Sequence, residues 1–274
     1  MEPIHPHSVA HQRQSSTALD HAIESYAHES VCALSWEGLS ATATLVATKD
    51  GSPIRSIITG RRRVTTGSYA SRKAGRGLPY ESMGERALFM QSEVDTDVVD
   101  YRAQPFRFEF VVGGQKRVYI VDCVRLLSDG SIEIVEVKHD AHGLRDPDYA
   151  AKLQAVKLIC ERVGWRFRVV LQKALRASQA FDDIIDIQSW RFTKFSKGDV
   201  YWVASTLGSD ALALGELAGV LGTLIPSSGA QGRALAAAKL KAMVVKRIVR
   251  FDLSKPLSSQ TKVALVADQA ELLQ

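Results

Sequence analysis

The fold is decided by residues 106–138, which read FRFEFVVGGQKRVYIVDCVRLLSDGSIEIVEVK. Three runs rich in β-branched and aromatic residues are separated by Gly113-Gly114 and by Ser128-Asp129-Gly130. A glycine pair between two such runs is a hairpin signal, and Ser-Asp-Gly is typical of a second tight turn. The sequence therefore predicts three consecutive strands, over residues 106–112, 117–127 and 132–138.

Helical patterns lie on both sides of these strands. Upstream, apolar residues recur with a helical period over residues 81–93. Downstream, Asp146 is a suitable N-cap and Pro147 suits the first helical position, so a helix is expected to about residue 163. A strand over residues 166–171 follows. The expected fold is α/β, of the α+β type with a mixed sheet, in the order αβββαβ.

The ends of the chain have a different texture. Near the N-terminus we expect a helix over residues 17–33, short strands at 43–47 and 56–58, and a basic loop at 71–77. In the C-terminal part, Ala/Leu-rich helices over 210–221 and 231–245 precede strands at 248–253 and 261–266, which is typical of a winged helix. The expected units are an N-terminal extension and helix (1–50), the α/β domain (51–175) and a winged-helix-like domain (186–274).

The composition excludes several classes of protein. Hydrophobic residues make up 46% and charged residues 24% of the 274 positions, which are globular and not low-complexity values. No apolar run approaches the roughly 20 residues that a membrane span needs. The polar beginning of the chain lacks the apolar stretch of a secretory signal. The cysteines Cys32, Cys123 and Cys160 form no CxxC pair, so we expect them to be reduced and the protein to be cytoplasmic.

Charge is distributed unevenly along the chain, whose formal net charge is +5. Residues 51–80 carry seven Arg or Lys and no acid, and residues 231–262 carry eight against one acid, whereas residues 81–100 are acidic. Two basic segments around an acidic centre fit a nucleic-acid protein with a metal site, and a solvated surface is the alternative. The basic residues that we expect to contact DNA phosphates are Arg61, Arg62, Arg63, Arg72, Lys73 and Arg76.

Asp122, Glu136 and Lys138 form the constellation that can carry chemistry. A three-residue turn at residues 128–130 would pair Asp122 with Glu136 and place both on one face, and a glycine in third position suits that turn. Two such carboxylates would hold Mg²⁺, while the lysine orients the attacking water or neutralises charge. An ordinary ion-pair cluster on a sheet is the alternative.

The helix before the strands adds an acid to this set. Glu81 and Glu85 are four residues apart and share a face of the expected helix. A bound metal would remove the repulsion for whichever carboxylate points inward, so the choice between them stays open at this point.

Short motifs in a fixed order link these residues to a known family. They are YES-x-x-E at 80–85, DVV-x-Y-x-x-QP at 97–105, Y-x-x-D at 119–122 and IVEVK at 134–138, with SRK-x-x-R at 71–76 and R-x-DLS-x-PLS-x-x-T at 250–261. Over roughly residues 53–265 the chain resembles the TnsA-type endonuclease. That protein is the subunit of heteromeric transposases that cuts the 5′ ends of the element.

The resemblance implies a restriction-endonuclease-like fold with a PD-(D/E)xK site that uses Mg²⁺ or Mn²⁺. It implies Asp122, Glu136 and Glu85 as metal ligands and Lys138 as the catalytic lysine, with Glu81 as the alternative helix acid and Gln104 as a supporting residue. The implied partners are double-stranded DNA at transposon ends, a DDE-type transposase subunit and an AAA+ regulator ATPase. The implied location is the bacterial cytoplasm, at the nucleoid.

One position departs from the family, and two other functions remain open. Val121 stands where the family commonly has a proline before the aspartate, and this changes only the entry to the strand. The alternatives are a stand-alone PD-(D/E)xK nuclease of restriction or DNA repair, and a non-catalytic DNA-binding assembly module.

Overall fold

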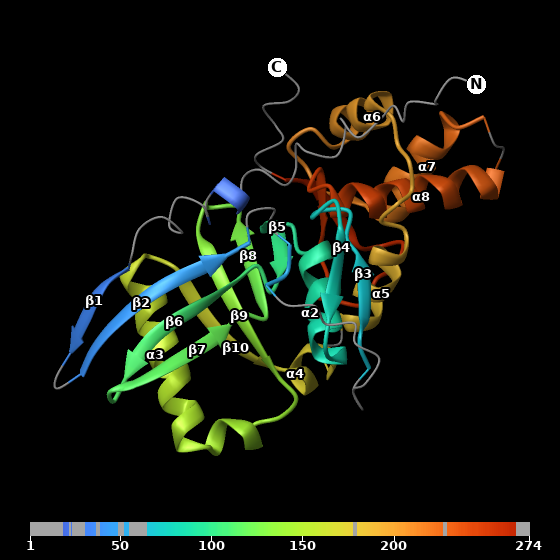
Figure 1. Ribbon diagram of the computed structural model, residues 1–274. Helices are drawn as coiled ribbons and strands as arrows, with labels where there is room; N and C mark the ends of the chain where they lie inside the picture. Colours follow the sequence, from blue (N-terminus) through green and yellow to red (C-terminus); the bar gives the residue numbers. More distant parts are fainter. Residues whose placement is uncertain are drawn as a thin grey trace, which may run out of the picture.

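The structure is a computed structural model, shown in Figure 1. It describes residues 19–21, 23, 31–36, 39–48, 52–54, 65–177, 180–226 and 229–266. The expected strand at 56–58 lies outside these residues. Among the described residues no helix is both long enough and apolar enough to cross a membrane.

The four-stranded central sheet and its helices have an αβββαβ order, but its first strand is at residues 98–103 and not at the expected 106–112, because residues 106–120 form two strands of a second sheet. The strands of the central sheet lie in the order β10-β9-β8-β5, with β10 parallel to β9 and the other neighbours antiparallel. Along the chain the order is α2, β5, β8, β9, α3, β10. The bounds are Met83–Val94 for α2, Val98–Ala103 for β5, Cys123–Leu127 for β8, Ile132–Lys138 for β9, Pro147–Arg162 for α3 and Arg166–Leu171 for β10.

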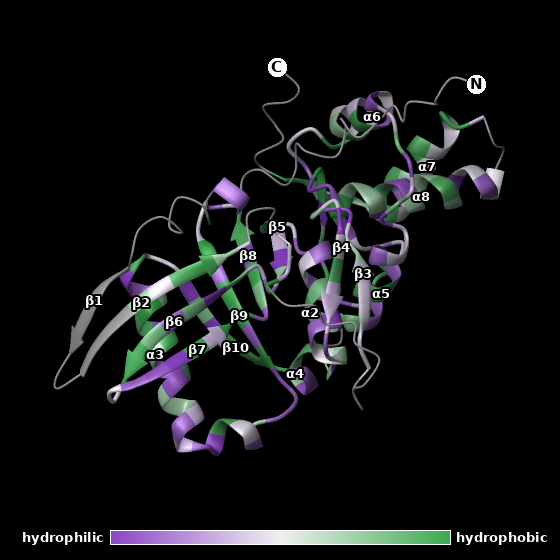
Figure 2. Ribbon diagram, viewed as in Figure 1, coloured by the Kyte–Doolittle hydropathy of each residue, from purple (hydrophilic) through white to green (hydrophobic). Residues whose placement is uncertain are grey.

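The two faces of this sheet are buried by different helices. Val124 and Ile134 point to the side of α3, whereas Cys123, Val135 and Val137 point to the side of α2. Figure 2 shows that β8 and β9 are largely apolar, whereas α3 alternates apolar and hydrophilic residues. Because β9 is buried on both faces, the charged residues Glu133, Glu136 and Lys138 within it are exceptional.

A second, antiparallel sheet in the order β1-β2-β6-β7 packs beside the first, with α3 against strands of both sheets. The β6–β7 hairpin turns at Gly113 and Gly114, whose φ angles of 59° and 74° lie in the left-handed region that favours glycine, as the glycine pair predicts. The strands are β1 (Val31–Trp36), β2 (Leu39–Ala47), β6 (Phe106–Val112) and β7 (Gln115–Ile120).

Three expectations for this half are wrong in detail. Residues 117–127 are two strands that belong to different sheets, because the chain leaves β7 at Val121 and enters β8 after Asp122. Strand β5 was not expected. The end of the predicted 17–33 helix lies in β1 instead, and only residues 19–21 and 23 are described as helical.

The C-terminal half packs around its own hydrophobic cluster, which Val94 of α2 also joins. The expected helices and strands are present there, with β11 and β12 pairing antiparallel on either side of β13. The elements are α5 (Phe181–Ser189), α6 (Lys197–Leu207), β11 (Leu212–Ala213), α7 (Leu214–Thr223), α8 (Gly229–Val245), β12 (Val249–Phe251) and β13 (Lys262–Leu265). The remaining elements are β3 (Gly67–Ala70), β4 (Gly77–Tyr80) and α4 (Gln172–Ala177).

Candidate active site

The pairing of β8 with β9 places Asp122 opposite Glu136. The last paired residues of this ladder are Cys123 and Val135, and continuing it by one residue brings the two acids together. The turn has three residues, since the Leu127 N–H donates to the Ser131 carbonyl at 2.9 Å and Gly130 adopts a φ of 80°. The predicted register is confirmed, so the acids lie at one edge of the central sheet.

Asp122 is half-buried at the point where the chain crosses from one sheet to the other. Its Oδ2 accepts a hydrogen bond from the Val137 N–H at 2.9 Å. Burial, followed by the charges of Glu136 and Glu85, raises the pKa of Asp122 well above its usual range, against the opposing effects of the Val137 N–H and of Lys138. Negative charge therefore accumulates here, and a cation would relieve it.

The Glu136 carboxylate is buried and surrounded by donors. Its Oε1 accepts from the Tyr149 hydroxyl at 2.6 Å and lies 2.5 Å from the Lys138 Nζ. Its Oε2 accepts a short hydrogen bond from the Tyr119 hydroxyl. These partners come from three different elements, namely α3, β9 itself and β7.

Lys138 follows Glu136 on the same face of β9 and is only partly buried. Burial lowers the pKa of Lys138, but the Glu136 carboxylate and the hydrogen bonds to Glu136 and Tyr149 outweigh it, so the pKa lies above its ordinary value. The ammonium group also lies 4.6 Å from the centre of the Tyr149 ring. The surroundings of Lys138 therefore favour its charged form.

Glu85 is buried in the first turn of α2, where it contacts the N-cap residue Ser82. Its Oε2 accepts from the Glu81 N–H at 2.9 Å, and its Oε1 accepts from the Ser82 hydroxyl at 3.1 Å. Because Glu85 is among the charges that raise the Asp122 pKa, its carboxylate lies close to the site. Glu81 is half-buried and contributes its backbone N–H to Glu85.

Gln104 supports Asp122 through its backbone. It is buried, with a φ of 47° that is uncommon for a residue other than glycine. Its N–H donates to the Asp122 carbonyl at 3.1 Å, and its own carbonyl accepts from the Ile54 N–H at 2.9 Å. The hydrogen bond from Gln104, which follows β5, therefore holds Asp122 where the chain passes from β7 to β8.

The oxygen donors of this site suit magnesium with two protein ligands. Among the described residues no three acidic, histidine or cysteine side chains converge closely enough to hold a metal ion by themselves. Mg²⁺ usually takes one or two carboxylates and completes its coordination with water and substrate phosphate. Asp122 and Glu136 fit that requirement, whereas Glu85 contacts the N-cap residue Ser82 as it stands.

The basic segment lies differently from what we expected. Arg61, Arg62 and Arg63 are outside the described residues. Lys73 is buried, and its Nζ donates to the carbonyls of Ser92 at 2.9 Å and Asp95 at 2.5 Å. A buried amine that already donates to two carbonyls at the end of α2 is not placed to bind a DNA phosphate.

Arg72 is also used inside the protein. Its Nη1 donates to the carbonyls of Arg191 at 2.5 Å and Thr193 at 3.0 Å, and its guanidinium lies 5.0 Å from the centre of the Phe195 ring. Arg76 is half-buried in the loop before β4. Of the basic residues predicted for DNA binding, Arg72 and Lys73 therefore tie the loop to α2 and to the C-terminal half.

Tyr119, Tyr149 and Lys152 are site residues that sequence reasoning missed or left on the outer face of a helix. The Lys152 Nζ lies 5.9 Å from the centre of the Tyr119 ring. Burial lowers the pKa of Lys152, and the Glu136 carboxylate acts against that change. Tyr119 stands in the Y-x-x-D motif at 119–122, but that motif does not indicate its contact with Glu136, and no motif marks Tyr149. The available signals were the place of Tyr149 in the first turn after the Asp146 cap, and the inward phase of Tyr119 in β7.

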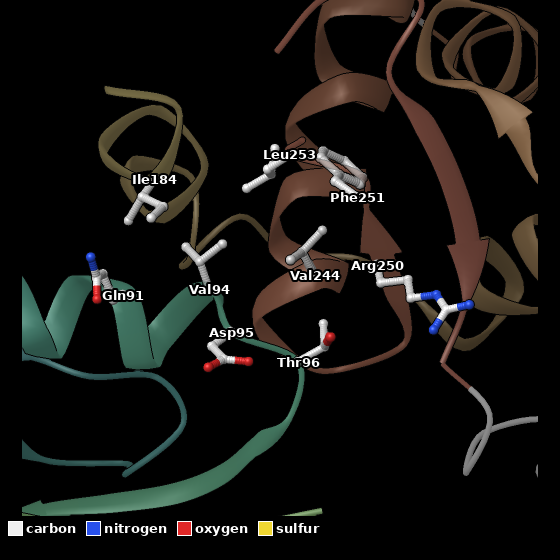
Figure 3. A pocket seen from close by; sticks show the side chains of 9 residues that line it. All are labelled: Gln91, Val94, Asp95, Thr96, Ile184, Val244, Arg250, Phe251 and Leu253. Carbon is white, nitrogen blue, oxygen red and sulfur yellow. The ribbon is translucent and has the colours of Figure 1, made fainter. Parts of the chain in front are cut away.

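A separate cavity of about 310 Å³ lies where the two halves meet (Figure 3). Gln91, Val94 and Asp95 from the end of α2 face Val244 of α8 and Phe251 of β12 across it. None of the candidate catalytic residues lines this cavity. It belongs to the junction between the halves and not to the chemistry at Asp122.

The fold and the site together define a class of protein. The mixed α/β core is consistent with a restriction-endonuclease-like fold, and Asp122, Glu136 and Lys138 lie together where β8 and β9 pair. Residues 95–172 match the sequence family described as TnsA-like endonuclease N terminal, which confirms the resemblance for this segment. The segment contains Asp122, Glu136, Lys138 and Tyr149 but not Glu85. No curated protein matches the chain.

Proposed function

We propose that the protein is a metal-dependent DNA endonuclease, the subunit of a TnsA-like heteromeric transposase that cuts the 5′ ends of the element. The family match gives the coarser statement, a nuclease role in Tn7-like transposition. The observation that supports the finer one is the meeting of Asp122, Glu136 and Lys138 within the matched segment.

Each side chain has a role that follows from its surroundings. Mg²⁺ or Mn²⁺ bound by Asp122 and Glu136 would supply charge neutralisation at the phosphate and acidify an attacking water. Lys138, held protonated by Glu136, donates to a phosphoryl oxygen or orients the water. Glu85 holds the first turn of α2 against the site and adds to its negative charge.

The test is cleavage of element-end DNA by the full chain, with and without its transposase partner. We expect Mg²⁺ or Mn²⁺ to be required and Asp122→Asn to remove cutting. Asp129→Asn is the matched control, because Asp129 is exposed in the β8–β9 turn and pairs with Arg166. Cutting by Asp122→Asn at the wild-type rate would contradict the proposal, as would wild-type cutting in the presence of a chelator.

We propose that residues 186–274 form a winged-helix-like unit, which follows the α/β domain at residues 51–175. The order α6-β11-α7-α8-β12-β13, with β13 between β11 and β12, supports it. Its proposed partners are the DDE-type transposase subunit, the AAA+ ATPase and DNA. Two lysines of α8 are already paired within the protein, Lys239 with Asp199 at 2.7 Å and Lys241 with Asp186 at 2.6 Å.

A further inference from the structure

Two tyrosine hydroxyls end on the same buried carboxylate. Tyr119 reaches Glu136 from β7 of the second sheet, and Tyr149 reaches it from the first turn of α3. Tyr119 donates to Oε2 and Tyr149 donates to Oε1, so each oxygen has its own hydroxyl donor. With Lys138 also on Oε1, the carboxylate is held from three directions.

This arrangement fixes the carboxylate and still leaves room for a cation. A carboxylate offers about four lone-pair sites, and the two hydroxyls and Lys138 use three of them. The remaining capacity is at Oε2, which has only Tyr119 as a donor among the described residues. Glu136 is thereby prepared to give one oxygen to a metal ion without rotating.

Tyr149 also holds the lysine. The Lys138 Nζ lies 4.6 Å from the centre of its ring while its hydroxyl is bonded to the lysine's own carboxylate partner. A cation over an aromatic face is stabilised by the ring, and more so where water is partly excluded. One side chain therefore sets the relative positions of the carboxylate and the ammonium group.

The Tyr149 hydroxyl is not needed to form or pack its helix. Asp146 caps α3, and Pro147 occupies the first turn. The buried face of the helix is supplied by Val156 and Ile159, together with other apolar residues. The Tyr149 hydroxyl instead donates to Glu136 at the candidate site.

We infer that Tyr149, together with Tyr119, is a positioning residue that fixes Glu136 for a divalent cation and Lys138 for the phosphate. The inference rests on the proposed metal-dependent function. Removing a hydrogen bond to a metal-binding carboxylate typically weakens metal affinity about 10- to 100-fold. Tyr149→Phe removes only the hydroxyl, whereas Tyr149→Leu also removes the ring under Lys138.

Mn²⁺ titrated calorimetrically into the full chain tests the hydroxyl. We expect Tyr149→Phe to bind Mn²⁺ about 10- to 100-fold more weakly than wild type. Tyr101→Phe is the matched control, because the Tyr101 hydroxyl makes the same type of bond, to Glu93 at 2.6 Å, away from the candidate site. It should bind Mn²⁺ as wild type does, and thermal unfolding should show that all variants are folded.

Cleavage measured against metal concentration separates the two parts of Tyr149. High Mg²⁺ should restore most of the maximal rate of Tyr149→Phe but not that of Tyr149→Leu, whose lysine is no longer held. Equal Mn²⁺ affinity in Tyr149→Phe and Tyr101→Phe would overturn the inference and leave the proposed function standing. A wild-type protein that neither binds Mn²⁺ nor cuts DNA with metal would overturn both.

Discussion

Lys138 is the one candidate catalytic group that its surroundings keep positively charged. Its carboxylate partner Glu136 retains two tyrosine donors without it. Lys138→Ala should therefore fold and bind Mn²⁺ nearly as wild type, while DNA cleavage falls by about two orders of magnitude or more. Lys157→Ala, on the exposed face of α3 and paired with Glu161, is the control. Wild-type cutting by Lys138→Ala in the reconstituted assay would refute its assigned role.

Lys73 predicts how stability depends on pH. Burial lowers its pKa to about 7, against the raising effects of Glu93 and Asp95. Between that value and about 10.4, its usual pKa, the unfolded chain binds a proton that the folded chain does not. The free energy of unfolding should therefore rise with pH across this window, by up to roughly 1.4 kcal/mol per unit from this group alone.

Urea unfolding of wild type and Lys73→Met, measured between pH 7 and pH 9.5, checks this prediction. The difference in stability between the two proteins should grow in favour of wild type as the pH rises, because methionine has no proton to lose. Parallel pH profiles would mean that Lys73 stays charged in the folded state. The neutral amine still has two N–H groups for the carbonyls of Ser92 and Asp95.

At the scale of elements, predictability follows the strength of local signals. Strands β9 and β10 and helix α3 were predicted well, since apolar runs, a cap and a proline mark them. Strand β5 was missed because it contains Asp100 and Arg102, whose charges indicate a surface. The structure buries both and pairs them at 2.5 Å. The break between β7 and β8 has no local signal, because residues 118–124 are almost continuously apolar and neither glycine nor proline separates the two strands.

The candidate site was predictable only where neighbouring strands determine it. The register of Asp122 with Glu136 followed from turn length alone. Tyr119 and Tyr149 come from other elements, so their contacts with Glu136 depend on how α3 and the second sheet pack against β9, which no local pattern shows. The basic loop was misjudged for a similar reason, because a sequence does not show the carbonyls that receive Arg72 and Lys73.

Helix α2 approaches strand β9 so closely that only glycine fits at position 84. A Cβ there would lie 2.8 Å from the Val137 Cγ1 and 3.1 Å from the Gln172 Cβ. Gly84→Ala should therefore destabilise the protein by about 1–3 kcal/mol, despite the better helix propensity of alanine. It should also lower cleavage, because Glu85 is the next residue.

Gly219 in α7 is the matched control, since nothing lies within 4 Å of a Cβ built there. Gly219→Ala should stabilise the protein by up to about 1 kcal/mol. Denaturant unfolding of the two variants gives the comparison. Stabilisation by Gly84→Ala would show that α2 is free to move away from β9.

At the scale of the whole molecule, α2 joins the two halves. Its first turn lies beside the candidate site, and Val94 near its end packs in the C-terminal cluster together with Ile187. Arg72 and Arg247 add hydrogen bonds across the same junction. The proposed boundary near residues 175–186 therefore separates two units that are in contact through α2.

DNA affinity should fall steeply as the salt concentration rises if the basic run at residues 61–63 neutralises phosphates. Replacing Arg61, Arg62 and Arg63 together by alanine should reduce the slope of log affinity against log salt by about 2.7, or about 0.9 for each phosphate contact. Arg72→Gln should leave the slope unchanged, because its guanidinium is bound to backbone carbonyls. Filter binding at several salt concentrations measures both slopes. An unchanged slope in the triple variant would show that this run does not contact DNA.

The β6–β7 hairpin offers a place to attach a reporter. Its ladder runs from the Arg107–Ile120 pair, beside the crossing at Asp122, to the Val112–Gln115 pair, a span of roughly 17 Å along the strand. At its tip, Gly113 and Gly114 are exposed and have open space around them. A short biotin-acceptor peptide inserted between them should be tolerated, as insertions at exposed loop tips usually are. The tagged protein could then be located by electron microscopy within the proposed transposition assembly while the candidate catalytic groups remain untouched.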